Sequence, residues 1–516
     1  MTLRQFIACL LTWVYFVGCS DAREDPRSAW LQSTLVEDNY PYALRSPDLV
    51  AGKFRKMAAG PYNFFRGTML QFTRDMVERP GWFPTRFGTP EAAQVVVIGD
   101  PHYENIGTYR ATDGALVLDF NDFDAASVGP FHLDVRRMAL SAYIAMVQVE
   151  EWRYEQSIAQ STTYTPLTTE ADRLDWSASV AFSYATEIGR LQQGGEPLRI
   201  RSKSGYGVII DDIMRRALRD GEAREELSDY TLLLDDERRR FTLGDIEPGE
   251  NGIIGDRLTE ASAADIHWLR EAWPELRNTL ARPDSIPAAF LAIKDISQRF
   301  GAGVSSYPLQ RFYVLVEGPT PDAGDDVLLE VKEAGNPTII PGLKYYPYPR
   351  FASNAERVVF YQRELQETAG NDPFLGWLDG SGARSDDFGQ VTKSSLGYRV
   401  RDRTKYQKDM DVSRLAEKLE ASDWTLADFS VFVAVTGRLL ASRHAVASVA
   451  GTLNDPLTTI HAAIDGRNDL FRDEARRFVA HYGPLVVEDY RRFSRLLDRH
   501  GPLLGIRSGL RTRDRL

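Results

Sequence analysis

The chain has 516 residues, of which 43% are hydrophobic and 11% aromatic, and its formal net charge is −11. This length predicts a large core and two or more lobes, and the ordinary composition excludes a wholly disordered chain. The negative charge argues against a general nucleic-acid binder, because such proteins need an excess of Lys and Arg. Beyond the N-terminal segment no apolar run is long enough to span a membrane, so the body is predicted to be soluble.

The N-terminus resembles an export signal. Residues 1–18 hold one basic residue and an apolar run, and Val17-Gly18-Cys19 resembles a lipobox. We predict cleavage before Cys19 and lipidation of Cys19, with Ser20 favouring the outer membrane. The expected location is the bacterial cell envelope, at the outer membrane or periplasmic face and not in the cytoplasm; an uncleaved signal anchor is the alternative. No disulfide is expected, because Cys9 leaves with the signal.

A polar segment then precedes the body. Residues 19–50 contain three prolines and are expected to form a tether that becomes ordered near the body. In the stretch Lys53–Met76, Arg66 lies among aromatic residues. Arg66 would meet a phosphate or one of the acidic clusters described next; a helix-surface charge or a structural ion pair is the alternative.

Two apolar runs each end in polar residues. Val95–Ile98 leads into Gly99-Asp100, as expected of a buried strand that delivers a carboxylate to a loop. The Asp113-Gly114 pair between the two runs is a hairpin signal. We therefore expect one hairpin to carry two acidic clusters to the same edge. The polar positions after the first run are Asp100 and Asn105, and those after the second run, Ala115–Leu118, include Asp119, Asp122 and Asp124.

This spacing is typical of kinase-type phosphoryl transfer. Asp100 would orient or deprotonate the acceptor, and Asn105 with a later aspartate would hold Mg²⁺, a hard ion that requires oxygen ligands. The plainer alternative is that Asp, Asn and Gly make turns here. A calcium loop starting at Asp119 is excluded, because Asp124 stands where that motif needs glycine.

At these residues the chain resembles a known family. Residues 99–107, GDPHYENIG, and 118–137, LDFNDFDAASVGPFHLDVRR, are similar to the signature GDxHxxNFG and DxNDFDExxxGPxxWDxKR of the uncharacterised bacterial family called domain of unknown function 2252. They are also similar to the HGDxHxxN and IDFxDAxxGPxxxDLA segments of aminoglycoside and choline phosphotransferases, which are kinase-like. The run PYNFFRG, which contains Arg66, resembles the family's SPFxFxRG element.

The resemblance suggests roles for the remaining polar residues. Asp119 suits the interval from Asn105, but Asp122 suits the interval to Asp134 in the phosphotransferases; Asp122 is favoured as second metal ligand, with Asp119 and Asp124 close behind. His102 is expected to brace the loop; a zinc site is not expected in a chain with only seven His. Asp134 would cap the next helix or hold the catalytic loop, a structural role in either case.

The second informative region begins after a mostly helical stretch. A Gly301-Ala302-Gly303 turn precedes a strand, a polar turn and a further strand that delivers Lys332. In kinases this order brings backbone amides and one ammonium to a nucleotide triphosphate. Gly301, Gly303 and Lys332 are therefore predicted to bind ATP, although Val304–Pro308 is bulkier than in the family; an ordinary strand-edge lysine is the alternative.

A helix follows the lysine strand. The segment NAERVVFYQRELQ resembles the family's GERVVxGQRxxQ, and its Glu356 is expected to pair with Lys332. A solvated helix face is the alternative for Glu356.

The order of these parts predicts a fold. Kinases place the glycine loop and lysine before the catalytic and metal loops, whereas this chain places them after. The expectation is an α+β, protein-kinase-like two-lobe fold that is circularly permuted and has a mostly helical large lobe. Its predicted parts are a first helical segment with the catalytic and metal loops at 51–298, a sheet-rich nucleotide-binding lobe at 299–410 and a second helical segment at 411–516.

The predicted function is that of an exported lipoprotein acting as an Mg²⁺- and ATP-dependent phosphoryl or nucleotidyl transferase, with an unknown small-molecule or protein acceptor and no nucleic-acid partner. The lipobox argues against it, because ATP is scarce outside the inner membrane. A non-catalytic surface module that binds a metal or a basic ligand, and an acid/base hydrolase with paired carboxylates, remain alternatives. Serine hydrolases and zinc peptidases are not indicated, since G-x-S-x-G and H-E-x-x-H are absent from the sequence.

Overall fold

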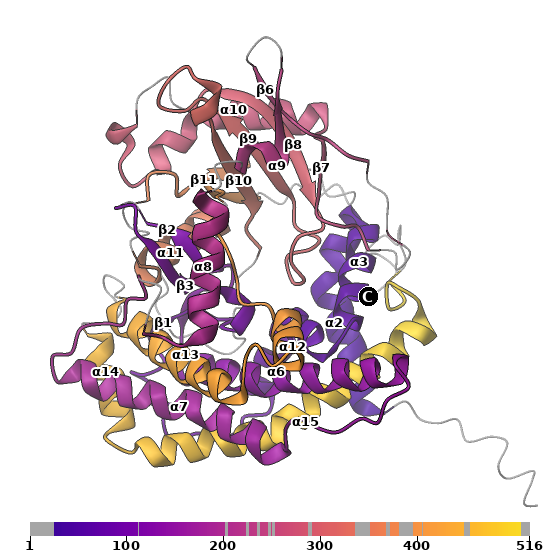
Figure 1. Ribbon diagram of the computed structural model, residues 1–516, viewed down its shortest axis with the longest axis vertical. Coiled ribbons are helices and arrows are strands. Elements are labelled where there is room, and N and C mark those ends of the chain that lie inside the picture. The colour runs from indigo at the N-terminus through magenta and orange to yellow at the C-terminus, as the bar shows by residue number, and fades with distance from the viewer. Residues whose placement is uncertain are drawn as a thin grey trace, which may run out of the picture.

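The protein combines one large antiparallel sheet with a larger body of helices (Figure 1). The mixed α+β class is confirmed, with 55% of the described residues in helices. The computed structural model describes residues 25–506 apart from 112, 202–204, 223–225, 235–237, 246–248, 250–252, 287–290, 336–350, 368–371, 381–395, 405 and 448–454. The predicted signal at 1–18 and the predicted lipidation site Cys19 lie outside the described residues.

The sheet has six strands in the order β11-β12-β10-β9-β8-β7, and every neighbouring pair is antiparallel. In β10, Leu329 and Val331 belong to an apolar core with helix α10, while Glu330 and Lys332 alternate to the opposite face. One face of the sheet therefore packs on α10 and the other carries charge. The bounds are β7 (Arg257–Glu260), β8 (Ile293–Phe300), β9 (Arg311–Val316), β10 (Val327–Glu333), β11 (Gly376–Asp379), β12 (Gly397–Asp402) and α10 (Ala263–Thr279).

The sheet-rich part begins before the segment 299–410 expected for it. Strand β7 and helix α10 lie wholly before residue 299, and β8 ends at residue 300. The small hairpin β5 (Thr231–Leu233) and β6 (Arg239–Phe241) covers one end of the charged face through a cluster that includes Phe241 and Tyr313. Helix α11 (Asn354–Leu365) packs against β11 and β12.

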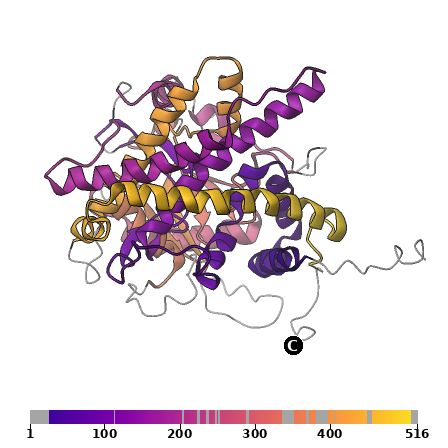
Figure 2. The ribbon, with the colours of Figure 1, turned by 90° about the horizontal axis from the view of Figure 1, so that it is seen from below.

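The helical body forms the lower half of Figure 1. Seen from below, the long helices α6, α7 and α15 lie side by side (Figure 2). A capping box at Thr169 and Asp172 starts α7, and a second at Thr425 and Asp428 starts α13. The helices are α6 (Phe131–Ala159), α7 (Glu170–Gln192), α8 (Val208–Glu222), α9 (Glu226–Tyr230), α12 (Val412–Glu420), α13 (Leu426–Val446), α14 (Pro456–Ile464) and α15 (Asn468–His500). None of the described helices has the length and apolar composition needed to cross a membrane.

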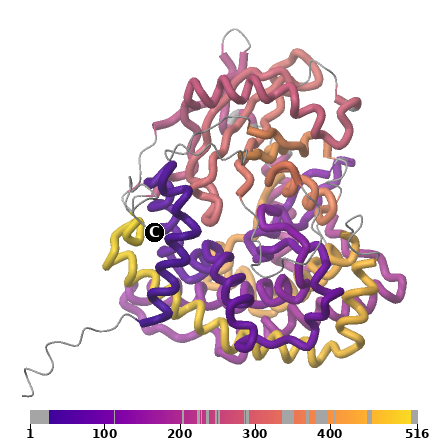
Figure 3. The backbone as a smooth tube through the Cα atoms, turned by 180° about the vertical axis from the view of Figure 1, so that it is seen from behind, coloured from indigo at the N-terminus to yellow at the C-terminus, as the bar shows by residue number. Residues whose placement is uncertain are grey.

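Four N-terminal helices lie beside the C-terminal helix α15 (Figure 3). The first of them falls within the segment expected to be a tether, yet its Leu31 and Leu35 are buried in the main core. The ion pair between Arg492 and Asp25 ties its start to α15. These helices are α2 (Pro26–Arg45), α3 (Pro47–Ala58), α4 (Pro61–Gly67) and α5 (Met69–Glu78).

The strands that carry the two acidic clusters pair differently from the prediction. The Asp113-Gly114 turn does close a hairpin, but the hairpin joins β2 (Ile106–Arg110) to β3 (Leu116–Phe120). The first apolar run forms β1 (Val95–Val97), which pairs with β4 (Ser127–Gly129). The single-hairpin prediction was wrong, because the sequence between the runs contains a further strand that takes the local partner.

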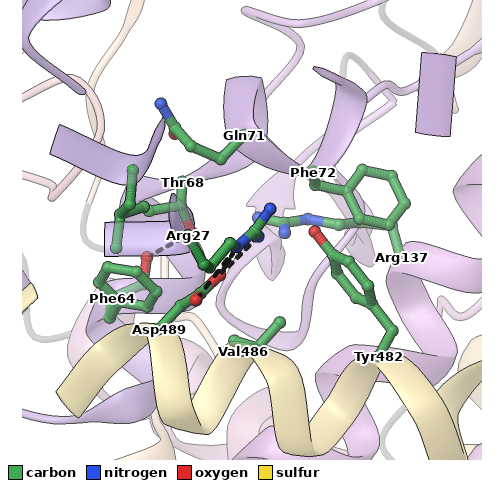
Figure 4. A pocket seen from close by; sticks show the side chains of 10 residues that line it. Arg27, Phe64, Thr68, Gln71, Phe72, Arg137, Tyr482, Val486 and Asp489 are labelled. Atoms are coloured by element: carbon green, nitrogen blue, oxygen red, sulfur yellow. Dashed lines mark hydrogen bonds and ion pairs between the residues drawn. The ribbon is translucent and has the colours of Figure 1, made fainter. Parts of the chain in front are cut away.

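A buried ion cluster joins three of the helices around a small pocket (Figure 4). Arg27 donates to Asp75 with both terminal nitrogens at 2.7 Å and to Asp489 at 2.5–3.2 Å. Tyr482 donates to Asp75 at 2.9 Å. The polar atoms of these side chains hydrogen-bond one another and so hold α2, α5 and α15 together. We therefore interpret the pocket as structural.

Replacing Asp75 with Asn is expected to lower the free energy of unfolding by about 2–4 kcal/mol, because the substitution leaves a buried guanidinium with one carboxylate instead of two. Urea unfolding followed by circular dichroism measures this change. Asp469→Asn on α15 is the matched control: Asp469 is 75% exposed and pairs with Arg472 at the surface, so its loss should cost less than about 1 kcal/mol. Equal effects of the two substitutions would contradict the structural role of the cluster.

Candidate functional site

The first site loop leaves β1 through Gly99. Its φ of +85° is one that side chains rarely adopt, and a Cβ atom there would lie 2.2 Å from the carbonyl oxygen of Ala125. The carboxylate of Asp134 accepts hydrogen bonds from the backbone amides of Ile98 at 2.7 Å and Gly99 at 3.0 Å. Asp134 therefore holds the loop from behind, as one of its two predicted roles required.

Asp134 is itself fixed by a buried chain of polar side chains. Its Oδ2 lies 3.0 Å from Nε2 of His444, and Nδ1 of His444 lies 2.9 Å from the hydroxyl of Tyr184. All three side chains are buried. This chain connects α13 and α7 to the site loop, so His444 supports the loop from the core.

Asp100 follows Gly99 and is the predicted catalytic residue. Arg137 donates from Nε to Asp100 Oδ1 at 2.8 Å and from Nη2 to the carbonyl of Phe65 at 2.7 Å. Burial raises the pKa of Asp100 despite the opposing charge of Arg137, and Asp122 adds to the rise. The carboxylate is thus oriented by a fixed cation and remains 15% exposed.

His102 packs against the same loop. Its ring lies edge-on to Tyr62 and Phe65, and its Nε2 is 3.9 Å from Asp100 Oδ2. Burial and the neighbouring arginines hold the pKa of His102 well below its usual value. A neutral, enclosed imidazole among aromatic rings agrees with a bracing position.

Asn105 joins the first loop to the second. Its Nδ2 donates to the carbonyl of Asp100 at 3.0 Å, and its own carbonyl accepts from the amide of Asn121 at 3.1 Å. This leaves the side-chain Oδ1 of Asn105 as an acceptor between the loops. The predicted metal ligands Asn105 and Asp122 therefore come from neighbouring loops.

Lys332 reaches the second loop from the sheet. Its Nζ lies 3.3 Å from Asp122 Oδ2 and 2.6 Å from Asp124 Oδ2, and the lysine side chain is only 4% exposed. Burial alone would raise the pKa of Asp122, but the charges of Lys332 and two arginines of β12 outweigh it and hold that pKa well below its ordinary value. Residues more than 200 positions apart thus meet as an ion pair.

Asp119 lies apart from this group. Its carboxylate accepts from the amides of Phe120 at 2.8 Å and Glu367 at 2.9 Å, and it pairs with Arg443 at 3.4 Å. The side chain is buried, and burial raises its pKa. The structure therefore turns Asp122 and Asp124 toward Lys332 and holds Asp119 in the core.

Glu356 has a local partner at the start of α11. Its carboxylate accepts from the amide of Ala352 at 2.6 Å, and its amide donates to Ser353 Oγ at 3.2 Å. Glu356 therefore caps its helix, and among the described residues the recorded ion pairs of Lys332 are to Asp122 and Asp124.

The next residue of α11 reaches the acidic loop instead. Arg357 donates to the carbonyls of Ala126 at 2.6 Å and Asp124 at 2.8 Å, and also to Gly335 at 3.2 Å. Burial lowers the pKa of Arg357 to about 10. Arg357 thus fixes the backbone of the acidic loop against the end of the lysine strand.

The glycine turn is docked on the helical body. Gly301 and Gly303 both have positive φ, and their carbonyls accept from Lys56 of α3 at 2.6 and 3.2 Å. Ser305 donates to the carbonyl of Arg66 at 3.0 Å, and the Arg66 side chain pairs with Glu104 of the first site loop. Arg66 therefore meets an acidic residue of the site, and the glycine turn and the Asp100 loop share one support.

Sequence reasoning missed a cluster of cations on the charged face of the sheet. Glu330 lies within 3.7 Å of four arginines, and their charges outweigh burial to hold its pKa well below the ordinary value. The signal was the alternating Arg-Val-Arg of β12, which places two guanidinium groups on one face. The four residues are Arg299, Arg311, Arg399 and Arg401.

The site offers oxygen ligands but no larger carboxylate cluster. Within the described ranges, no group of three or more His, Cys, Asp or Glu side chains is arranged to hold a metal ion. Asp122, Asp124 and the Asn105 amide are the oxygen donors, a set whose chemistry suits a hard cation such as Mg²⁺.

Comparison with known proteins places the chain in a family. The sequence profile of the uncharacterised proteins conserved in bacteria, domain of unknown function 2252, matches residues 45–496. The chain belongs to this family. Comparisons with curated proteins and with solved structures find no match. The matched range of this domain of unknown function 2252 protein includes both site loops, the glycine turn and the six-stranded sheet.

Gly99→Ala is expected to lower the free energy of unfolding by about 2–5 kcal/mol, because it adds both left-handed backbone strain and a clash with the Ala125 carbonyl. Gly194→Ala is the matched control, since Gly194 has a φ of +87° but open space around the added methyl group; it should cost about 1–2 kcal/mol. Urea unfolding measures both. If the two variants lost the same stability, the close approach of Gly99 to Ala125 would not constrain the loop.

Proposed function

We propose that this protein is a magnesium- and nucleotide-dependent phosphoryl or nucleotidyl transferase with a circularly permuted, kinase-like arrangement. The observation that carries the proposal is the meeting of Lys332 with Asp122 and Asp124, beside Asp100 and Asn105. These residues come from two segments that only the fold brings together, and each is of the type that phosphoryl transfer requires.

The arrangement of strands supports the kinase-like part of the proposal. The glycine turn connects β8 to β9, and Lys332 lies on the next strand, β10. Kinases likewise carry their phosphate-binding lysine on a strand that follows the glycine-rich loop in the same sheet. The adjacency of α2 and α15 supports the permutation, because neighbouring helices can be joined by a short connection while the order of the segments changes.

The local environments suggest different roles for the two carboxylates. Asp100 has a raised pKa and an exposed edge, so it is suited to accept a proton from an acceptor hydroxyl. Asp122 has a lowered pKa and stays ionised, so with Asp124 and Asn105 it would hold Mg²⁺. The ion would neutralise charge on the transferring phosphoryl group. Arg137 keeps the Asp100 carboxylate in one orientation.

The non-catalytic alternative has one observation in its favour. The helix carboxylate expected to pair with Lys332 caps its own helix, and the lysine is held by the two aspartates that a metal would need. A protein that keeps this ion pair permanently would bind a metal or a basic ligand without transfer. An exported location, which is a further part of the proposal, would favour this reading because ATP is scarce there.

Nucleotide-induced thermal stabilisation distinguishes the two functions. With Mg²⁺ and a nucleoside triphosphate at about 100 times its Kd, the folded state should gain about 2.7 kcal/mol and the melting temperature should rise. Lys332→Ala should lose this shift. Lys294→Ala is the matched control, because Lys294 also lies on the sheet and also pairs with two carboxylates, Asp326 and Glu317; it should retain the shift. A shift with Mg²⁺ or Ca²⁺ alone and none with any nucleotide would instead favour the binding module.

The pH dependence of turnover tests Asp100. Asp100→Asn should reduce magnesium-dependent nucleotide turnover by about 10²- to 10⁴-fold, the usual contribution of a general base. Because the base must be ionised, kcat/KM of the wild type should rise with pH through a pKa above the ordinary carboxyl value of about 3.9. Arg137→Gln removes the charge that lowers this pKa, so its acidic limb should move to higher pH.

Arg136→Gln is the control for that measurement. Arg136 is the preceding residue and equally buried, but it pairs with Glu474 on α15. Its acidic limb should match the wild type. An identical shift in both variants, or a pH-independent rate, would remove Asp100 from the role of base.

A further inference from the structure

Three cations lie in a row across the strands beside the acidic loop. Lys332 of β10 is directly opposite Arg311 of β9 on one side and Arg399 of β12 on the other. Side chains directly opposite each other on neighbouring antiparallel strands share a face and lie within contact distance. Like charges in such positions destabilise a sheet, so this row requires anions to stabilise it.

The anions within the protein compensate the row only in part. Asp122 and Asp124 pair with Lys332, while Glu330 lies 3.7 Å from Arg311 and 3.4 Å from Arg399. Glu330 also serves two further arginines. One carboxylate cannot give short, paired hydrogen bonds to four guanidinium groups, so donors in this cluster remain unsatisfied.

Arg399 is the residue where this deficit is largest. It is 1% exposed, yet within the part of the chain that the structure describes its Nε and Nη1 have no hydrogen-bond partner. Among the described residues, no other side chain has two buried polar atoms in this state. Arg399 also lies within electrostatic reach of Asp122 and Asp124. Buried donors without partners cost free energy, and an anionic ligand that enters between the sheet and the acidic loop would satisfy them.

We propose that the row of Arg311, Lys332 and Arg399 is the polyphosphate-binding surface of the site, and that Nε and Nη1 of Arg399, on different edges of the guanidinium, each donate to a separate polyphosphate oxygen. This inference rests on the proposed function and adds the group that is recognised. The guanidinium of Arg399 carries donors on more than one edge, so it can contact oxygens of neighbouring phosphate groups while Nη2 stays with Glu330.

The same face indicates what is not recognised. In the neighbouring row Glu330, two residues from Lys332, forms an ion pair at 3.2 Å with its cross-strand partner Arg401, and its other cross-strand partner, Tyr313, is fully buried and leaves no open slot there. Nucleobases bind in slots lined mainly by apolar and aromatic side chains. The ligand class is therefore a magnesium-bound linear triphosphate, either free or as part of a nucleoside triphosphate, and the base contributes little to affinity.

Isothermal titration calorimetry of the full chain with Mg²⁺ tests this, using inorganic tripolyphosphate, ATP and AMP as ligands. Tripolyphosphate is expected to bind with a Kd within about threefold of that of ATP, and AMP much more weakly. Arg399→Lys should weaken tripolyphosphate and ATP equally, by about tenfold or more, because it removes the two donors, Nε and Nη1, that are proposed to contact phosphate oxygens. Arg363→Lys is the control, since this partly buried arginine of α11 donates to the carbonyls of Thr279 and Leu375; the variant should bind both ligands as the wild type does.

The outcomes separate this inference from the proposed function. Binding of ATP without binding of tripolyphosphate would overturn the inference and leave the proposed function intact. Binding of neither would overturn both. Wild-type affinity in a folded Arg399→Lys variant would remove Arg399 from the phosphate site. If that variant does not fold, Arg311→Lys serves in its place, and unchanged affinity there would overturn the row as a phosphate surface.

Discussion

The arrangement of the whole molecule depends on one buried ammonium group. Lys332 leaves the charged face of the sheet and ends between Asp122 and Asp124 of the helical body. The Lys332 side chain is 4% exposed and pairs with two carboxylates, so moving the sheet away from the acidic loop would leave a buried charge unpaired. Arg357 and Arg401 strengthen the same contact by donating to backbone carbonyls of that loop.

This contact gives the two site carboxylates different properties. Asp100 is supported from the helical body, by Arg137 and by the loop that Asp134 holds, and burial raises its pKa. Asp122 faces the cations of the sheet, which lower its pKa. Groups whose environments push their pKa values apart are suited to separate acid/base and charge-binding roles. The carboxylate supported by the helical body therefore has a raised pKa, and the carboxylate facing the sheet has a lowered one.

The sequence predicted site residues well where the pattern was local, and less well where contacts between distant segments determine the position of a side chain. Spacing and apolar runs indicated Asp100, Asn105 and Lys332, and the resemblance to phosphotransferases favoured Asp122; the structure brings these residues together. The interval argument for Asp119 did not account for the burial of β3: all five residues of this strand are buried, and the Asp119 carboxylate is hydrogen-bonded in the core. Glu356 was expected to pair with Lys332, but it hydrogen-bonds at the start of its own helix. This local interaction competes with the ion pair, and a resemblance between helices does not reveal it. Arg399 belongs to the alternating Arg-Val-Arg of β12, but its two unpartnered donors could not be predicted, because they arise only in the folded sheet.

The ligand that fits this site must satisfy two opposite layers of charge. The loops of the helical body present carboxylates and an amide oxygen, and the sheet presents a lysine with an excess of arginines. A free divalent cation would satisfy the loops but compete with Lys332 and leave the row of cations less compensated. A free anion would satisfy the row but approach Asp122 and Asp124 with like charge. A polyphosphate that carries its own divalent cation satisfies both layers at once. Membership of a family with no assigned chemistry does not identify this ligand, whereas the charges of the site do indicate it.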